Sequence, residues 1–281
     1  MRGGFERAAI VGVGLIGGSL GLALRRTCPG LHVRGVGRDR GRLEIARSMG
    51  AIDEWVTGIE GGVGDRDLVI LATPVEHIMS TLEAIGPLLA PGALLTDVGS
   101  TKRSVCRKAW NSVPDGIEFI GGHPVAGREL TGVQHSLPDL FVNAPYVLCP
   151  YAGKESPQLG KLLSLVKGIG AQPHVMTPED HDLAIAWVSH LPQLLSTTLA
   201  LSVADRRTEI SGSGLRDMLR LAGSSHAVWQ SVFATNRDMI DQVLAGFIED
   251  LRKMRGKVAA GSLEVDFEAA ARVYERLKAA R

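Results

Sequence analysis

Apolar residues in the first part of the chain occur in short, nearly continuous runs, and the stretches between these runs show helical periodicity. The runs predict strands at Ala8–Val11, His32–Gly37, Asp67–Ala72, Leu94–Val98, Glu118–Ile120 and Tyr146–Pro150. The intervening stretches predict helices near residues 42–48, 78–89, 102–110 and 159–166. Strands that are apolar on both faces and alternate with helices are typical of a parallel sheet covered by helices. Such sheets bind ligands at the carboxyl ends of their strands.

A glycine-rich segment follows the first predicted strand and opens the first predicted helix. Gly12, Gly14 and Gly17 have the spacing Gly-x-Gly-x-x-Gly. The first glycine allows a tight turn, the second lets backbone approach a pyrophosphate, and the third lets the helix lie close to the strand. The free N–H groups at the start of a helix attract anions. A glycine turn without a ligand is the alternative. The context favours a Rossmann-type dinucleotide-binding domain.

The pattern changes near residue 177. Thr177 is suited to cap a helix, with Pro178 in its first turn and Asp180 reaching back. Apolar residues then recur at helical spacing to the end of the chain. We therefore expect an α/β Rossmann-type nucleotide-binding domain over residues 1–177 and an all-α substrate and dimerisation domain over residues 178–281. The helix from Pro178 is apolar on more than one face, which favours burial in a homodimer.

Composition narrows the classes of partner. The 281 residues are 45% hydrophobic and carry a net charge of +1, so no strong field favours nucleic acid or a membrane surface. Three widely spaced cysteines form neither a disulfide framework nor a metal motif, and they fit a reducing cytoplasm. The first strand begins by about Ala8, which leaves no room for a signal peptide. The longest apolar stretch, Trp187–Val203, contains His190, Pro192 and Gln193 and is interpreted as a buried helix.

Three stretches carry candidate substrate-binding chemistry. His123 follows a predicted strand between glycines and can accept a proton from a hydroxyl that loses hydride, or it simply hydrogen-bonds its own loop. His190 precedes Pro192, which cannot donate to the helix and predicts a kink beside a pocket; a buried core histidine is the alternative. Arg216 and Arg220 share a helix face and could clamp a carboxylate, or they are solvated charges.

Four sequence motifs follow one another along the chain and point to a family: His123–Gly127, Met176–Asp182, Ser189–Pro192 and Arg216–Arg220. With the glycine turn, they resemble the prephenate/arogenate dehydrogenase family of tyrosine biosynthesis, over nearly the whole chain. The resemblance implies oxidative decarboxylation of prephenate or arogenate, to 4-hydroxyphenylpyruvate or tyrosine, with hydride transfer to NAD(P)+. It also implies a nucleotide-binding domain followed by a helical dimerisation domain.

The resemblance assigns roles by matching position. His123 would interact with the ring hydroxyl, and Ser100 would lie between nicotinamide and substrate. His190 would line the substrate pocket, Arg220 would meet a substrate carboxylate, and Glu129 matches an acidic position near the site.

Three departures from the family pattern concern the substrate side chain. Arg128 stands where a small hydroxyl residue is common, Leu130 where a basic residue is frequent, and Gln193 where a second histidine is frequent. The choice between a keto and an amino side chain, prephenate or arogenate, therefore stays open at this point.

The cofactor preference depends on the end of the second strand. An acidic residue normally receives the adenine ribose of NAD there, but this position is Gly37, followed by Arg38. A guanidinium can pair with a 2′-phosphate, which favours NADP with Arg38 as its main contact. Asp39 could instead receive the ribose, so NAD remains the alternative. The cofactor-binding residues predicted are Gly12, Gly14, Leu15, Ile16, Gly17, Arg38, Thr73 and Pro74.

Two rival functions share this architecture. A β-hydroxyacid or 6-phosphogluconate type dehydrogenase would use a lysine base on the helix after the nucleotide domain, where this chain has His181 and His190. A non-catalytic dinucleotide sensor would not need His123, Ser100 and Arg220 together.

Overall fold

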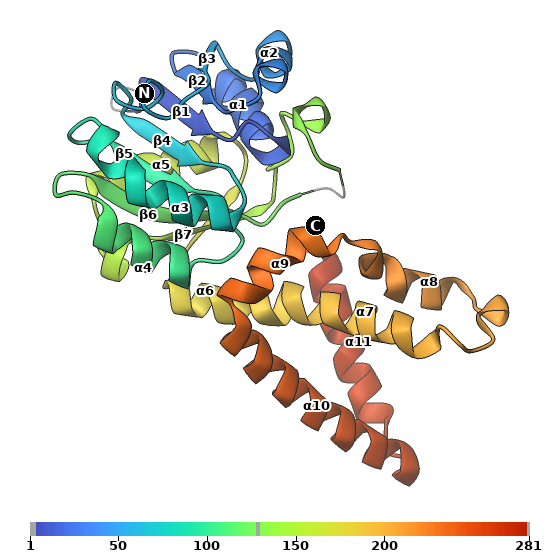
Figure 1. The fold of residues 1–281 in the computed structure, drawn as a ribbon. Helices are drawn as coiled ribbons and strands as arrows, with labels where there is room; N and C mark the ends of the chain where they lie inside the picture. Colours follow the sequence, from blue (N-terminus) through green and yellow to red (C-terminus); the bar gives the residue numbers. More distant parts are fainter. Residues whose placement is uncertain (1–3, 128–129, 280–281) are drawn as a thin grey trace. The chain divides into compact units, whose positions relative to one another are not determined.

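The computed structural model describes residues 4–127 and 130–279 (Figure 1). The strands are β1 (Arg7–Val11), β2 (His32–Val36), β3 (Glu54–Val56), β4 (Leu68–Leu71), β5 (Leu94–Asp97), β6 (Glu118–Pro124), β7 (Pro145–Cys149) and β8 (Gln172–Val175). The α-helices are α1 (Leu15–Thr27), α2 (Arg40–Ser48), α3 (Val75–Ile85), α4 (Arg103–Ser112), α5 (Pro157–Gly168), α6 (Pro178–Ile185), α7 (Leu191–Val203), α8 (Ser213–Leu219), α9 (His226–Thr235), α10 (Arg237–Ala260) and α11 (Glu264–Ala279). A π-helical turn spans Ala186–His190, and short 3₁₀ helices include Val133–His135 and Arg220–Gly223.

The strands form one eight-stranded sheet in the order β3-β2-β1-β4-β5-β6-β7-β8. The strands from β3 to β6 are parallel, as the apolar runs predict. The sixth predicted strand departs from the parallel arrangement, because β7 runs antiparallel to β6, while β8 is parallel to β7. Within its described residues, the β6–β7 connection holds only a 3₁₀ turn, without the crossover helix that a parallel connection uses.

Each face of the sheet carries its own apolar core. In β1, Ala8 and Ile10 belong to one buried cluster, whereas Ala9 and Val11 belong to the other. The first cluster includes residues of α1, α2 and α5, and the second includes residues of α3 and α4. Because side chains alternate along a strand, runs that are apolar at every position are buried on both sides.

The chain divides into two compact units. One unit holds the described residues of Met1–Ala184 with Ser224–Asn236, and the other holds Ile185–Gly223 and the described residues of Arg237–Arg281. The predicted boundary after residue 177 therefore falls shortly before this division, and α9 belongs to the sheet-containing unit. A physical reason is that Asp182 on α6 accepts hydrogen bonds from the backbone N–H groups of Lys102 and Arg103.

The helical unit is organised around α7. Ser196 donates a hydrogen bond to the carbonyl of Met218 at 2.8 Å and accepts one from the N–H of Ala222 at 3.0 Å. Gln193 Nε2 donates to the carbonyl of Leu221 at 2.9 Å. The break predicted from Pro192 takes the form of the π-helical turn directly before α7. No described helix is long and apolar enough to cross a lipid bilayer.

Candidate functional site

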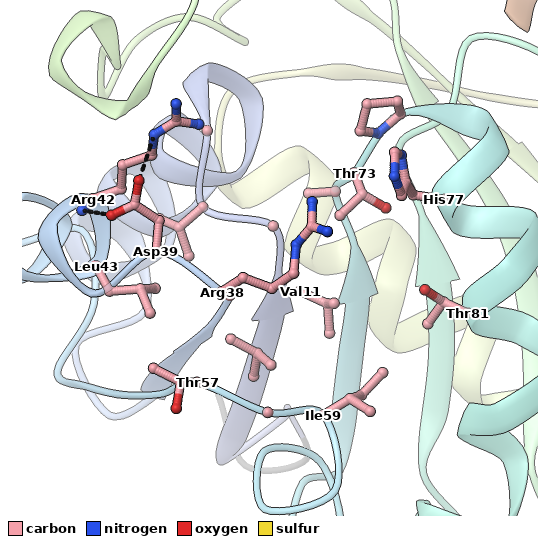
Figure 2. Close-up of a pocket in the computed structure, with 18 of the residues that line it drawn as sticks. Val11, Arg38, Asp39, Arg42, Leu43, Thr57, Ile59, Thr73, His77 and Thr81 are labelled. Carbon is pink, nitrogen blue, oxygen red and sulfur yellow. Dashed lines mark hydrogen bonds and ion pairs between the residues drawn. The ribbon is translucent and has the colours of Figure 1, made fainter.

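A pocket of about 630 Å³ opens at the carboxyl ends of β1, β2 and β4 (Figure 2). The residues that follow these strands line it, and they include Gly12, Gly14, Gly37, Arg38, Thr73 and Pro74. The pocket lies within the sheet-containing unit. This is the edge at which parallel sheets bind ligands, and five of the predicted cofactor residues meet there.

The three motif glycines meet three different spatial demands. Gly12 has φ +97°, and a Cβ there would lie 2.6 Å from Thr73 Cγ2. A Cβ on Gly17 would lie 2.2 Å from the carbonyl oxygen of Gly12, so α1 packs directly on the turn. A Cβ on Gly14 would meet nothing within 4 Å, because this position faces open pocket. The backbone at Gly14 is therefore accessible to a pyrophosphate.

The start of α1 supplies the donors for such an anion. Gly14 is the N-cap residue and, as a glycine, has no side chain with which to cap the helix. Leu15 and Ile16 form the first turn of α1, where backbone N–H groups have no partner earlier in the helix. Neither of their side chains lines the pocket, so their predicted contribution is that of the backbone. Ser136 Oγ holds the turn by donating to the carbonyls of Gly14 and Leu15, at 3.3 and 3.1 Å.

The pocket also contains an unpaired polar atom. Thr73 Oγ1 is buried and has no hydrogen-bond partner among residues 4–127 and 130–279. Buried hydroxyls are ordinarily hydrogen-bonded, so an orphan in a pocket wall suits a polar ligand. This atom, the open position at Gly14 and the uncapped N-terminus of α1 fit a nicotinamide dinucleotide.

The end of β2 differs from a typical NAD site. Asp39 caps α2 by accepting from the N–H of Arg42 at 3.1 Å, and it pairs with Arg42 Nε at 3.2 Å. Figure 2 shows both contacts, and it shows the Arg38 side chain extending toward Thr73. Within the described part of the chain, Arg38 has no hydrogen-bond or ion-pair partner. The guanidinium groups of Arg38 and Arg42 therefore line this side of the pocket. Asp39, the acid directly after β2, is engaged as the cap of α2.

His123 is the penultimate residue of β6, at the same edge of the sheet as the pocket. Its Nδ1 lies 2.8 Å from Nε2 of His181 on α6, and the two rings meet edge to face. His181 Nδ1 in turn lies 2.8 Å from Oδ1 of Asp182. The sequence motifs place these residues in separate regions of the chain, and the fold joins them into one hydrogen-bonded row.

Burial and hydrogen bonding set the charges of this row. Burial lowers the pKa of His181 and outweighs the opposing effect of Asp182, which favours a neutral ring. Burial alone would raise the pKa of Asp182, but hydrogen bonds from His181 and from the N–H groups of Lys102 and Arg103 lower it overall. Asp182 is therefore an anion that accepts three hydrogen bonds.

A second buried charge pair holds the backbone just before His123. Asp97 at the end of β5 forms an ion pair with Lys102, and both side chains are completely buried. Asp97 accepts from the N–H groups of Gly99 at 2.8 Å and Gly122 at 3.0 Å. Lys102 Nζ donates to the carbonyl of Gly122 at 2.7 Å. The backbone of Gly122 is thus bound on both its N–H and its carbonyl.

Ser100 follows β5, and β5 lies between β4 and β6 in the sheet. Its loop therefore begins between the strand that ends at the pocket and the strand that carries His123. The position of Ser100 between nicotinamide and substrate stays a prediction.

The other predicted substrate residues belong to the helical unit, apart from Glu129. His190 is buried at the end of the π-helical turn, where such turns are frequent at functional sites. Arg216 on α8 and Arg220 at the end of that helix are both exposed. Glu129, like Arg128, lies outside the described residues.

Sequence reasoning assigned no role to several residues of these networks. Asp97 and Lys102 looked like ordinary strand-end and helix-start residues, and a lysine predicted near a helix surface is normally exposed. His181 and Asp182 lay in a recognised motif without an assigned role. Arg42 and His77 of the pocket wall were not predicted, since polar residues on amphipathic helices usually face solvent. Among the described residues, no group of three potential ligands could hold a metal ion.

Comparison with known proteins agrees with this arrangement. Residues 20–175 match the nucleotide-binding domain of prephenate dehydrogenase, and residues 177–271 match its dimerization domain. The prephenate dehydrogenase of Bacillus subtilis (strain 168) is 33% identical over 253 residues, which is 88% of this chain and 68% of that protein.

Two solved structures are similar over nearly their whole length. Synechocystis arogenate dehydrogenase has 30% identity and a TM-score of 0.85, with coverage of 97% of this chain and 99% of that one. Prephenate dehydrogenase from A. aeolicus, in complex with hydroxyphenyl propionate and NAD+, has 27% identity and a TM-score of 0.87, with coverage of 97% and 98%.

The pocket at the carboxyl edge of the sheet, together with the match to a prephenate dehydrogenase nucleotide-binding domain, places the chain in the class of nicotinamide-dinucleotide-linked dehydrogenases. Its helical second unit corresponds to a dimerization domain. The chain belongs to the prephenate dehydrogenase family, whose members oxidise and decarboxylate prephenate or arogenate in tyrosine biosynthesis.

Proposed function

We propose that His123 is the proton acceptor of the oxidative decarboxylation of prephenate or arogenate. The observation that carries this proposal is that His123, the loop of Ser100 and the dinucleotide pocket follow neighbouring strands at one edge of one sheet. Oxidised nicotinamide, when bound, would supply the acceptor for the hydride of the carbinol carbon. His123 takes the proton from the hydroxyl oxygen on that carbon, and loss of carbon dioxide then makes the ring aromatic. Ser100 orients the reacting groups.

We propose the remaining substrate-binding roles from the family resemblance, residue by residue. Arg220, directly after the helix α8 that carries Arg216, is suited to hold a carboxylate that is present in both the ground and transition states. His190 would line the substrate pocket, and Glu129, outside the described residues, matches an acidic position of the family. Arg220→Gln should therefore raise KM with little change in kcat. An unchanged KM would remove Arg220 from substrate binding.

The test of His123 is the substitution His123→Asn, assayed by nicotinamide reduction with prephenate and with arogenate. Asparagine keeps a polar group but cannot take the proton, so kcat should fall by about 10²- to 10⁴-fold, with cofactor affinity unchanged. His174→Asn is the matched control, because His174 is an exposed histidine on β8. A His123→Asn variant with normal kcat would contradict the proposal. The faster of the two substrates in the parental protein identifies the side chain, keto or amino, that the site prefers.

We propose that the chain prefers NADP, with Arg38 as its main contact. The support is that Arg38 and Arg42 both line the pocket, while Asp39 is engaged as the cap of α2. NAD is the alternative, and it is the cofactor bound in the A. aeolicus relative. A guanidinium pairs with a 2′-phosphate, and a carboxylate repels it.

The experiment is the ratio of kcat/KM for the two cofactors in the parental protein and in Gly37→Asp. A Cβ at Gly37 would lie 3.5 Å from Leu43, which is ordinary contact, so a side chain can begin at this position without a clash. We expect the parental protein to prefer NADP and Gly37→Asp to prefer NAD, whereas the control Gly37→Ala should keep the original preference. A parental preference for NAD would overturn the proposal.

We also propose that the chain is a homodimer through its helical unit. In the single chain, large apolar side chains on α10 and α11 are more than half exposed, namely Leu251, Val258, Val265, Phe267, Tyr274 and Leu277. Apolar surface of this extent is typical of a protein interface. The match of residues 177–271 to a dimerization domain supports the same assignment. A cytoplasmic location remains a proposal from the cysteine pattern.

A further inference from the structure

We propose that His181 and Asp182 are positioning residues that hold His123 in the one tautomer able to accept the substrate proton. The inference builds on the proposed role of His123. It concerns the direction of the hydrogen bonds along the row Asp182–His181–His123, which the distances alone do not give.

The direction starts at Asp182. Its carboxylate already accepts the N–H groups of Lys102 at 2.7 Å and Arg103 at 3.0 Å, which fixes it as an anionic acceptor. His181 Nδ1, 2.8 Å from the same carboxylate, must therefore carry a hydrogen and donate it. A neutral imidazole that donates from Nδ1 has its lone pair on Nε2.

The remaining step fixes the tautomer of His123. The lone pair on His181 Nε2 faces His123 Nδ1 at 2.8 Å, so His123 must donate from Nδ1. In its neutral form, His123 then carries its lone pair on Nε2. Burial lowers the pKa of His181, which keeps that ring neutral and preserves the direction of the row. In catalytic triads, a buried carboxylate sets the tautomer of the catalytic histidine directly. Here the carboxylate of Asp182 would do so through the ring of His181.

The row is anchored at both ends. The backbone carbonyl of Asp182 accepts from Asn236 Nδ2 at 2.8 Å. At the other end, Gly122, the residue before His123, is bound by Asp97 and Lys102. Rotation of the His181 ring would break a buried hydrogen bond to Asp182, so the arrangement resists reversal.

The kinetic experiment compares two substitutions at His181. His181→Leu removes the acceptor that faces His123, and kcat should fall by about 10- to 100-fold while KM for substrate and cofactor stays within about twofold. His181→Gln offers a carbonyl oxygen in place of Nε2 and should recover kcat to within about threefold of the parental value. His174→Gln, at the exposed histidine of β8, is the matched control. The proposal is overturned if His181→Leu keeps its kcat, if it alters only KM, or if the glutamine variant is as slow as the leucine variant.

A spectroscopic measurement tests the tautomer in the unmodified protein, without reliance on variants that could fold poorly. Nitrogen-15 spectra of histidine-labelled protein distinguish protonated from unprotonated ring nitrogens, and the His123→Asn spectrum identifies the His123 signals. We expect neutral His123 to be protonated at Nδ1 and unprotonated at Nε2. The opposite tautomer would overturn the inference. Because this readout needs no turnover, absence of activity with both cyclohexadienyl substrates would contradict the proposed function, and the tautomer would still decide the inference.

Discussion

The buried pair of Asp97 and Lys102 should make a large contribution to the stability of the nucleotide-binding unit, and Lys102→Met tests it. Both side chains are fully buried, so the substitution leaves a carboxylate in the protein interior without its cation. Removing one partner of a buried pair typically costs about 3–5 kcal/mol. Two features of the site change this loss of stability in opposite directions. Asp97 keeps two backbone donors, from Gly99 and Gly122, whereas the carbonyl of Gly122 loses the Nζ donor.

We therefore expect Lys102→Met to lower the free energy of unfolding by about 3 kcal/mol, near the lower end of that range. The assay is urea denaturation followed by far-ultraviolet circular dichroism. Lys108→Met is the matched control, since Lys108 on α4 pairs with the exposed Glu83 and should cost less than about 1 kcal/mol. The double variant Asp97→Asn/Lys102→Met removes both charges and should be less destabilised than Lys102→Met alone. Equal losses from Lys102→Met and Lys108→Met would refute the reasoning.

Three further predictions follow from other parts of the structure. Gly14→Val should weaken cofactor binding at least about tenfold without lowering the melting temperature. Gly17→Ala should lower the melting temperature, because its Cβ would meet the carbonyl of Gly12. The reverse pattern would contradict the assignment of the turn. Burial lowers the pKa of His181 from 6.5, so as the pH drops below about 6.5 this histidine takes up a proton in the unfolded chain before it does so in the folded one, and stability should fall. In thermal melts, the stability of His181→Gln should fall less steeply with decreasing pH. Equal pH dependence of the two proteins would rule this out. Light scattering at micromolar concentration should give twice the 29.9 kDa chain mass, and the mass of a single chain would exclude the proposed homodimer.

The sequence predicted those elements whose geometry is set by residues close to one another in the chain. Continuous apolar runs identified the central strands, because burial on both faces requires apolar residues at every position. Thr177 and Asp180 predicted the start of α6, where the Thr177 hydroxyl accepts from the N–H of Asp180 and donates to its carboxylate. The glycine spacing predicted the turn after β1, because Gly12 and Gly17 satisfy constraints within a few residues of each other.

Two features of the sheet were decided by long-range contacts. The edge strand β3 is three residues long and only partly buried, so it has no apolar run from which it could be predicted. The antiparallel direction of β7 depends on how the β6–β7 connection returns to the sheet, and the apolar content of a strand is the same in either direction.

The hydrogen-bonded row at His123 also depends on the tertiary structure. His123 could be identified as a candidate base from its own loop, but its partner His181 is 58 residues away and comes from the helix after the sheet. Lys102 and Asp97 are only five residues apart, yet their complete burial follows from the packing of β5, β6 and α4 around them. The sequence by itself determined which residues have the right chemistry. The tertiary structure determined which of them share a hydrogen bond, because that depends on the meeting of segments distant along the chain.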